Sequence, residues 1–232
     1  MQAAKAGKTP TLDELLEDLA DQPTTAQWSR DNADRRTIAE VLGVPVATWT
    51  SRTKGAKTET RDARRLARAV EAITALPRAG EYLHIITGQE FRGFDLLPAM
   101  LKLAKARRFD ALTLTTLGFS RENLADLAAM IEAAQILPAR LRILCSDFFR
   151  RADREIWRTG ADQARRLGYD FRSTRNHTKL ILAKIGRRFY VVESSANLRS
   201  CANLEQFTLT QSRKLYDFHE SWLNQVWQTA EI

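Results

Sequence analysis

Four residues whose side chains can act on a phosphate lie close together in the segment RNHTKLILAKIGRRFYVVESSANLRS, residues 175–200. One residue separates His177 from Lys179, and Ser195 and Asn197 follow within the next eighteen positions. Lysine and asparagine can hold phosphate oxygens, a hydroxyl can donate to one, and an imidazole can attack phosphorus directly. The segment contains no obvious pair of carboxylates for a divalent metal. These residues therefore favour metal-free chemistry at a phosphoryl centre, and we expect no cofactor.

A β-hairpin would bring these side chains together. Residues 177–184 favour one strand, Gly186 favours a turn, and residues 187–194 favour the returning strand. On such a strand, His177 and Lys179 point to the same face, about 6.6 Å apart at a rise of about 3.3 Å per residue. The returning strand then carries the serine and the asparagine back towards the histidine.

The order His-x-Lys, Ser-x-Asn after a short hairpin, and then a glutamate resembles the signature of the phospholipase D superfamily. By this resemblance, His177 is the nucleophile that forms a phosphohistidine, and Lys179 and Asn197 bind the phosphate. The resemblance also implies that Ser195 assists and that Glu205 orients the histidine.

The chain departs from the family signature in two places. Lys184 stands where the family has an aspartate, and Ser194 stands where it has a glycine. Family members use two such motifs, because a second histidine protonates the leaving group, but His84 and His219 lack a lysine two residues later. We expect a structural role for His84 and a surface or interface role for His219. The resemblance therefore implies a homodimer with a composite active site.

The residues around the motif predict an α/β fold with a mixed β-sheet flanked by helices, as in phospholipase D-like proteins. The resemblance covers residues 81–210. Apolar alternation and helical periodicity predict strands and helices in turn. The predicted strands are residues 81–88, 111–119, 139–146, 169–174, 177–184, 187–194 and 205–211, and the predicted helices are residues 94–108, 121–137, 150–168 and 212–230.

Three details of these elements are predicted from the sequence. Ser120 is expected to cap the second of these helices, and the basic helix over residues 150–168 is expected to bend at Gly160. The buried face of the last helix is expected to consist of Leu215, Phe218, Trp222 and Val226. Cys145 lies in an apolar run, which predicts a buried thiol in the core.

The first 78 residues read as a small all-helical domain, so we predict two domains, residues 1–78 and 79–232. Within the first, residues 35–57 are compatible with a helix-turn-helix, in which Arg52 and Lys54 would contact phosphates. A packing or dimerisation domain is the alternative.

Charge favours a polyanionic partner. The chain carries 36 Lys and Arg against 28 Asp and Glu, and residues 140–199 alone carry fifteen against six. A basic groove made by Arg150, Arg151, Arg172 and Arg175 would follow a phosphodiester backbone, and DNA is the favoured partner. The sequence contains no apolar run long enough to span a membrane and no apolar leader, so a cytoplasmic protein without membrane contact is expected.

Together with the resemblance, these features predict a metal-independent phosphodiesterase, most simply a nuclease that cleaves DNA as a homodimer. The alternative is a DNA-binding or regulatory protein whose phospholipase D-like domain is degenerate and does not cleave. Phospholipid cleavage is a third and less favoured hypothesis, because no interfacial amphipathic helix stands out.

Overall fold

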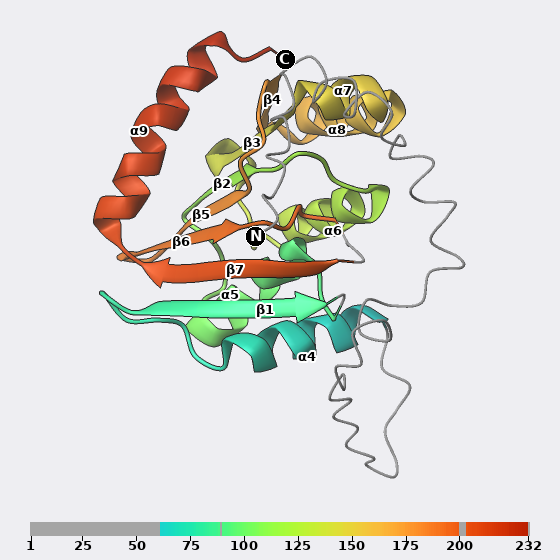
Figure 1. Cartoon of the computed structure of the whole chain (residues 1–232). Coiled ribbons are helices and arrows are strands. Elements are labelled where there is room, and N and C mark those ends of the chain that lie inside the picture. The colour runs from blue at the N-terminus through green and yellow to red at the C-terminus, as the bar shows by residue number, and fades with distance from the viewer. Residues whose placement is uncertain (1–60, 89, 200–202, 232) are drawn as a thin grey trace, which may run out of the picture. The chain divides into compact units, whose positions relative to one another are not determined.

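A computed structural model describes residues 61–88, 90–199 and 203–231 of the chain (Figure 1). Seven strands form one mixed sheet in the order β1-β7-β6-β5-β2-β3-β4. The strands are β1 (Tyr82–Gly88), β2 (Ala111–Thr115), β3 (Leu141–Ser146), β4 (Asp170–Thr174), β5 (Leu180–Ile185), β6 (Arg188–Ser194) and β7 (Leu204–Gln211). The helices are α4 (Arg61–Ile73), α5 (Leu96–Ala104), α6 (Arg121–Glu132), α7 (Asp147–Ala152), α8 (Arg154–Leu167) and α9 (Arg213–Thr229), with short 3-10 turns η2 (Gly93–Asp95) and η3 (Pro138–Arg140).

The strand directions bring several loops to one edge of the sheet. Strands β2, β3 and β4 run parallel, whereas β5, β6, β7 and β1 pair antiparallel with their neighbours. One edge of the sheet therefore contains the starts of β5 and β7. The carboxyl ends of the other five strands lie at the same edge: β1, β2, β3, β4 and β6. This edge receives the His-x-Lys segment before β5 and the Ser-x-Asn segment after β6.

Helices cover both faces of the sheet (Figure 1). Helix α9 covers one face, where Leu182 and Val191 pack against Leu223 and Trp227. The larger core lies on the other face, under helices α4 to α8. Residues that follow one another in β5, such as Ile181 and Leu182, belong to the two different clusters, as the alternation of side chains along a strand requires.

The predicted fold class is confirmed, because the structure is a mixed sheet flanked by helices. Each strand and helix predicted between residues 81 and 230 has a counterpart, with bounds that differ by a few residues or more. The predicted Ser120 cap is also confirmed, since its side chain accepts a hydrogen bond from the Asn123 amide at 3.2 Å. Cys145 is fully buried, as expected.

The predicted start of the strand over residues 177–184 is wrong, because β5 begins only at Leu180. His177 and Lys179 lie in the loop that precedes the strand. The reason is Asn176, a buried residue whose side chain bonds to backbone groups and competes with the strand ladder.

The basic helix is also divided at a different residue than expected. It breaks at Asp153, with φ −115° and ψ 49°, and not at Gly160. Gly160 remains inside α8, where a Cβ atom would lie 2.8 Å from the Phe119 ring. The absence of a side chain at Gly160 therefore allows α8 to pack closely against Phe119, and this residue does not bend the helix.

The predicted buried face of α9 is confirmed in part, because Leu215, Trp222 and Val226 are half-buried against the core on that side of the sheet. The buried residues are Tyr216, His219, Leu223 and Trp227, whereas Phe218 is 61% exposed. Both stripes have helical spacing, so the apolar pattern alone did not choose between them. The choice comes from the sheet, because the partners of α9 include the polar Arg142 as well as apolar residues.

Helix α4 belongs to the same compact unit as the sheet, residues 56–232. Its Ala69 and Ile73 are buried in the larger core. The division into domains at residues 1–78 and 79–232 stays a prediction. The helix-turn-helix prediction, with Arg52 and Lys54, lies outside the described residues. Among the described helices, none combines the length and apolar character needed to cross a lipid bilayer.

Candidate active site

The predicted site residues gather at the sheet edge where β5 and β7 begin and β6 ends. An open cleft of about 520 Å³ lies there. Its lining includes His177, Lys179, Ser195, Glu193, His219 and Trp222. Three of the five predicted site residues thus share one cleft. Glu205 contacts one of its lining residues, Ser195, whereas Asn197 is not among the lining residues and is held by the Leu117 amide.

The loop that carries His177 is anchored by its buried neighbour Asn176. The Asn176 amide donates to the carbonyls of Thr116 at 3.2 Å and Leu144 at 3.4 Å. Its oxygen accepts from the Thr178 amide at 2.9 Å and from the Thr178 hydroxyl at 2.6 Å. The buried amide therefore fixes the loop to the ends of β2 and β3 and leaves His177 exposed.

Lys179 turns back onto His177. Its ammonium nitrogen lies 3.0 Å from His177 Nδ1 and 2.8 Å from the His177 carbonyl oxygen. The same nitrogen lies 3.4 Å from His177 Nε2, so it faces both ring nitrogens, and the tautomer of the ring decides which of them accepts. Burial lowers the pKa of Lys179, and the charge of Glu205 opposes this shift. An ammonium group and an imidazole therefore lie side by side in the cleft.

Ser195 joins the cleft to β7. Its hydroxyl donates to Glu205 Oε2 and accepts from the Gln206 amide at 3.0 Å. Its own amide donates to the Gln206 carbonyl at 3.0 Å. In the described part of the chain, Glu205 forms no hydrogen bond with His177, so its carboxylate acts here on Ser195 and, through its charge, on Lys179.

Asn197 has a fixed amide orientation. Its Oδ1 accepts from the Leu117 amide at 3.1 Å, and a backbone N–H can only donate. The Nδ2 group is therefore the side of the amide that is left to donate to a ligand. Gly93 backs this segment closely, because a Cβ atom there would lie 2.8 Å from the Asn197 carbonyl oxygen.

The two departures from the family signature lie in different surroundings. Lys184 lies near the far end of β5 from the cleft, with its ammonium 5.6 Å from the centre of the Phe189 ring. It takes no part in the site. Ser194 lines the cleft, and its hydroxyl donates to the Ala196 carbonyl at 3.0 Å.

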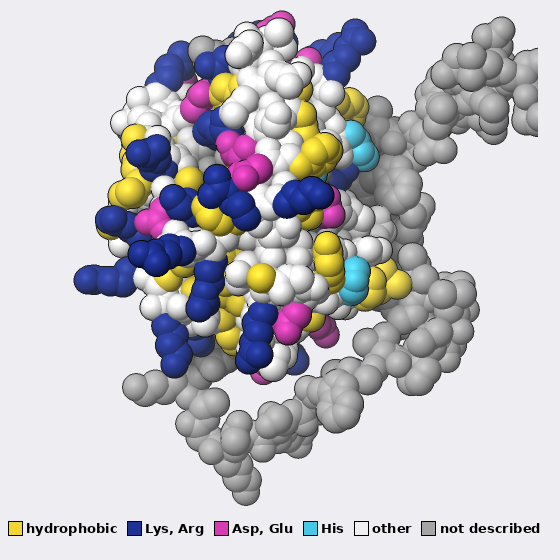
Figure 2. Space-filling model, turned by 90° about the vertical axis from the view of Figure 1, so that its left-hand side faces the viewer, with side chains coloured by type: hydrophobic (Ala, Val, Ile, Leu, Met, Phe, Trp, Pro, Cys, Tyr) yellow, Lys and Arg dark blue, Asp and Glu magenta, His cyan; other side chains and the backbone are white. Residues whose placement is uncertain are grey.

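The predicted DNA-contacting arginines are engaged to different degrees. Arg150 pairs with Asp147 and Glu231, and Arg151 donates to the Asp147 carbonyl. Arg172 fastens α9, since it donates to the Trp227 carbonyl at 2.7 Å. Arg175, two residues before His177, is exposed and has no ion-pair partner among the described residues. Figure 2, seen from the α9 side, shows Lys and Arg side chains spread over that face with fewer Asp and Glu.

The two remaining histidines differ from each other. His84 is exposed, and its Nδ1 lies 3.2 Å from the Thr208 hydroxyl. The surface role expected for His219 is wrong, because its side chain is buried. Its Nε2 lies 3.0 Å from Glu193 Oε1, and both side chains line the cleft.

Two buried residues hold segments of the site in place, and the sequence did not reveal their roles. Asn176 directly precedes the motif histidine, and its place in the sequence was the only signal. Arg92, for which the sequence allowed either a role in the site or the capping of a loop, is 3% exposed and pairs with Asp95 at 2.7 Å and Asp126 at 2.6 Å. It joins η2 to α6, because one of its carboxylate partners, Asp126, lies 34 residues away in the sequence.

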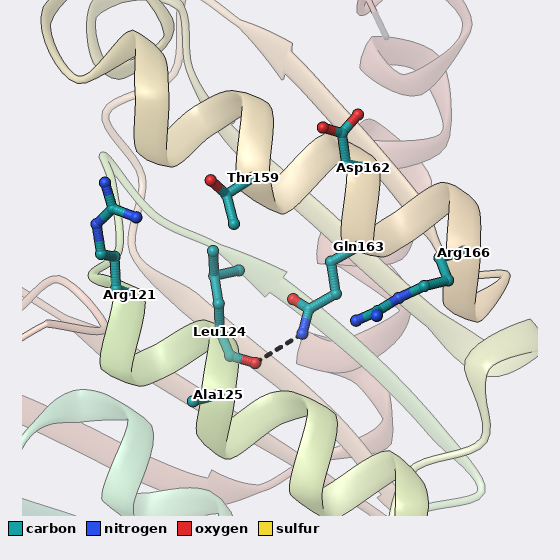
Figure 3. A pocket seen from close by; sticks show the side chains of 7 residues that line it. All are labelled: Arg121, Leu124, Ala125, Thr159, Asp162, Gln163 and Arg166. Carbon is teal, nitrogen blue, oxygen red and sulfur yellow. Dashed lines mark hydrogen bonds between the residues drawn. The ribbon is translucent and has the colours of Figure 1, made fainter.

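A second hollow, of about 480 Å³, lies between α6 and α8 (Figure 3). Arg121 and Arg166 stand at its two ends, and Gln163 donates to the Leu124 carbonyl at 2.8 Å across it. Gln163 is thus engaged in holding the two helices together. The hollow contains none of the residues that the sequence motif singles out.

Several solved structures are similar to this chain in fold. Nuc from Salmonella typhimurium, a phospholipase D family member, has a TM-score of 0.46 and 18% identity over 65% of this chain and 97% of that one. NucT from Helicobacter pylori has a TM-score of 0.39 and 10% identity over 65% of this chain and 99% of that one. TrmBL2, an archaeal chromatin protein whose structure shows a novel mode of DNA binding, has a TM-score of 0.42 and 12% identity over 94% and 65%.

No protein-family model and no curated protein matches the sequence. At these identities and TM-scores, the likenesses concern the fold and do not extend to substrate or mechanism.

Proposed function

We propose that this protein is a metal-independent phosphodiesterase, and more specifically a nuclease that cleaves DNA as a homodimer in the cytoplasm. The observation that carries the proposal is the contact of Lys179 with His177, at 3.0 Å, in an open cleft that Ser195 also lines. An imidazole in its neutral form can attack a phosphorus atom whose oxygens a neighbouring cation holds.

In the first step, a ring nitrogen of His177 attacks phosphorus and the bond to the leaving oxygen breaks. The leaving oxygen takes a proton from the second subunit's histidine, which completes the composite site. Lys179 and the Asn197 amide hold the non-bridging oxygens, and the Ser195 hydroxyl turns from Glu205 to donate to one of them. In the second step, water attacks the phosphohistidine, loses a proton to that second histidine, and releases the phosphate product and His177.

The basic character of residues 140–199 and the exposed Arg175 beside the motif support a nucleic-acid substrate. The helical region predicted over residues 1–78, with Arg52 and Lys54, would add a second contact to DNA. The buried thiol of Cys145 is compatible with a reducing compartment.

The experiment is a cleavage assay on single-stranded and duplex DNA in excess EDTA, with the full chain and its His177→Ala variant. We expect cleavage by the wild type and a loss of at least about 10³-fold in the variant, as removal of a covalent nucleophile entails. His84→Ala is the matched control, because His84 is also an exposed histidine at the surface of the sheet. Equal loss in both variants, or full activity in His177→Ala, would contradict the proposal.

A non-cleaving DNA-binding or regulatory protein is the second candidate. It is favoured by the engagement of Glu205 with Ser195 instead of His177, together with Lys184 and Ser194 at the family's aspartate and glycine positions. This reading predicts salt-sensitive binding of DNA, no cleavage, and little effect of His177→Ala on affinity.

A further inference from the structure

The wall of the cleft on the α9 side carries a chain of hydrogen bonds that the proposed mechanism does not use. Trp222 Nε1 lies 3.1 Å from His219 Nδ1, and His219 Nε2 lies 3.0 Å from Glu193 Oε1. All three residues line the cleft together with His177 and Lys179. This series of hydrogen bonds ends at the carboxylate of Glu193, whose side chain is 47% exposed.

The direction of these hydrogen bonds follows from the indole. An indole N–H can only donate, so His219 Nδ1 must accept and the ring proton must sit on Nε2, which donates to Glu193. Both ring nitrogens of His219 are thus occupied, and the ring is neutral. His219 therefore holds the Glu193 carboxylate in place and has no lone pair or proton to exchange with the cleft.

Glu193 stands close to the phosphate-binding side of the cleft. It pairs across the strands with Leu180, the residue that directly follows Lys179. A fixed carboxylate near a phosphate site repels a phosphate group. That cost is offset only if the rest of the ligand offers hydrogen-bond donors to the carboxylate.

Aromatic surface accompanies this acceptor. Trp222 lines the cleft, and Phe218, 61% exposed, meets the His219 ring edge-on at 5.2 Å between ring centres. Aromatic side chains beside a phosphate site offer stacking surface to unpaired bases. A carboxylate beside such a surface accepts from an exocyclic amine, as from N4 of cytosine.

We propose that Glu193, positioned by the Trp222–His219 pair, is a specificity residue that accepts a hydrogen bond from the amino group of a base next to the bound phosphate. The proposal rests on the nucleic-acid substrate of the proposed function. It predicts a preference for cytosine over thymine, because these pyrimidines differ mainly at position 4, where cytosine has an amino donor and thymine has a carbonyl acceptor that the carboxylate repels.

The test is the affinity of the full chain for fluorescent dC8 and dT8 at neutral pH in EDTA, in the His177→Ala background so that neither probe is cleaved. We expect dC8 to bind about 5- to 100-fold more tightly than dT8. Glu193→Gln should bring the ratio towards one, since an amide both donates and accepts. Trp222→Phe, which keeps an aromatic ring but removes the N–H that orders His219, should reduce the ratio to a smaller extent.

Glu132→Gln is the matched control, because Glu132 is an exposed acid at the end of α6 that should leave the ratio unchanged. Equal affinities for dC8 and dT8, or an unchanged ratio in Glu193→Gln, would overturn the proposal. So would a parallel change in affinity for both probes, which would indicate a purely electrostatic role. The proposal would also be overturned if the protein bound phosphatidylcholine vesicles and showed no preference between dC8 and dT8. That result would indicate that the Glu193 side of the cleft binds an ammonium head group.

The outcome is separable from that of the nuclease proposal. A dC8 preference that depends on Glu193, in a wild-type protein that does not cleave, would support the base-binding wall and refute the nuclease. Cleavage that depends on His177 but shows no base preference would do the reverse.

Discussion

Replacing the buried Asn176 by alanine should destabilise the protein and disable the cleft. Asn176 is 7% exposed and satisfies both sides of its amide inside the fold. The Leu144 carbonyl would keep a second donor, the Thr116 amide at 3.1 Å. The Thr116 carbonyl and the Thr178 amide would lose the partners they have at 3.2 Å and 2.9 Å. At about 1–3 kcal/mol for each of these two orphaned groups, the expected loss is about 2–6 kcal/mol.

The loss is measured as the change in free energy of unfolding in urea at constant m-value. Asn203→Ala is the control, because Asn203 is exposed and should change that free energy by less than about 0.5 kcal/mol. In the folded fraction, the displaced His177 loop should lower cleavage by about 100-fold, as a misplacement of about 1 Å can. A change in unfolding free energy below about 0.5 kcal/mol for Asn176→Ala would refute the anchoring role.

Three further outcomes are expected. Gly93→Ala should lower the free energy of unfolding by about 1–3 kcal/mol, since its Cβ would lie 2.8 Å from the Asn197 carbonyl oxygen, and an unchanged urea midpoint would contradict this. Because burial lowers the pKa of Lys179 and the charge of Glu205 raises it, Glu205→Gln should lower that pKa further and move the alkaline limb of the pH–rate profile to lower pH; movement to higher pH would count against it. Burial raises the pKa of Cys145 to about 12, so a thiol reagent should label it only on unfolding, and rapid labelling of the native protein would disagree.

Much of the fold follows from local patterns in the sequence. Strand alternation and helix periodicity predict the elements from residue 81 onwards, and Ser120 marks the start of α6 through a cap that depends only on neighbours in the sequence. These signals are local, so no knowledge of the tertiary structure is needed to read them. The proximity of His177 and Lys179 is predictable for the same reason.

Other features depend on contacts between distant segments. The face that α9 buries is decided by its fit to β3, β5 and β6, and two stripes one residue apart were equally compatible with the sequence. Arg92 gains its role from Asp126, 34 residues away. The start of β5 at Leu180 follows from Asn176, whose amide reaches the ends of β2 and β3 once the sheet has formed.

The central claim is covalent catalysis by His177, and peptide mass spectrometry of the trapped intermediate tests it most directly. The full chain is mixed with a DNA substrate in EDTA, quenched within the first turnover at alkaline pH, where a phosphohistidine survives, and digested. We predict a nucleotidyl adduct on the peptide that contains His177, absent from His177→Ala. Cleavage that proceeds with no adduct in the wild type, or that persists in His177→Ala, would contradict the account.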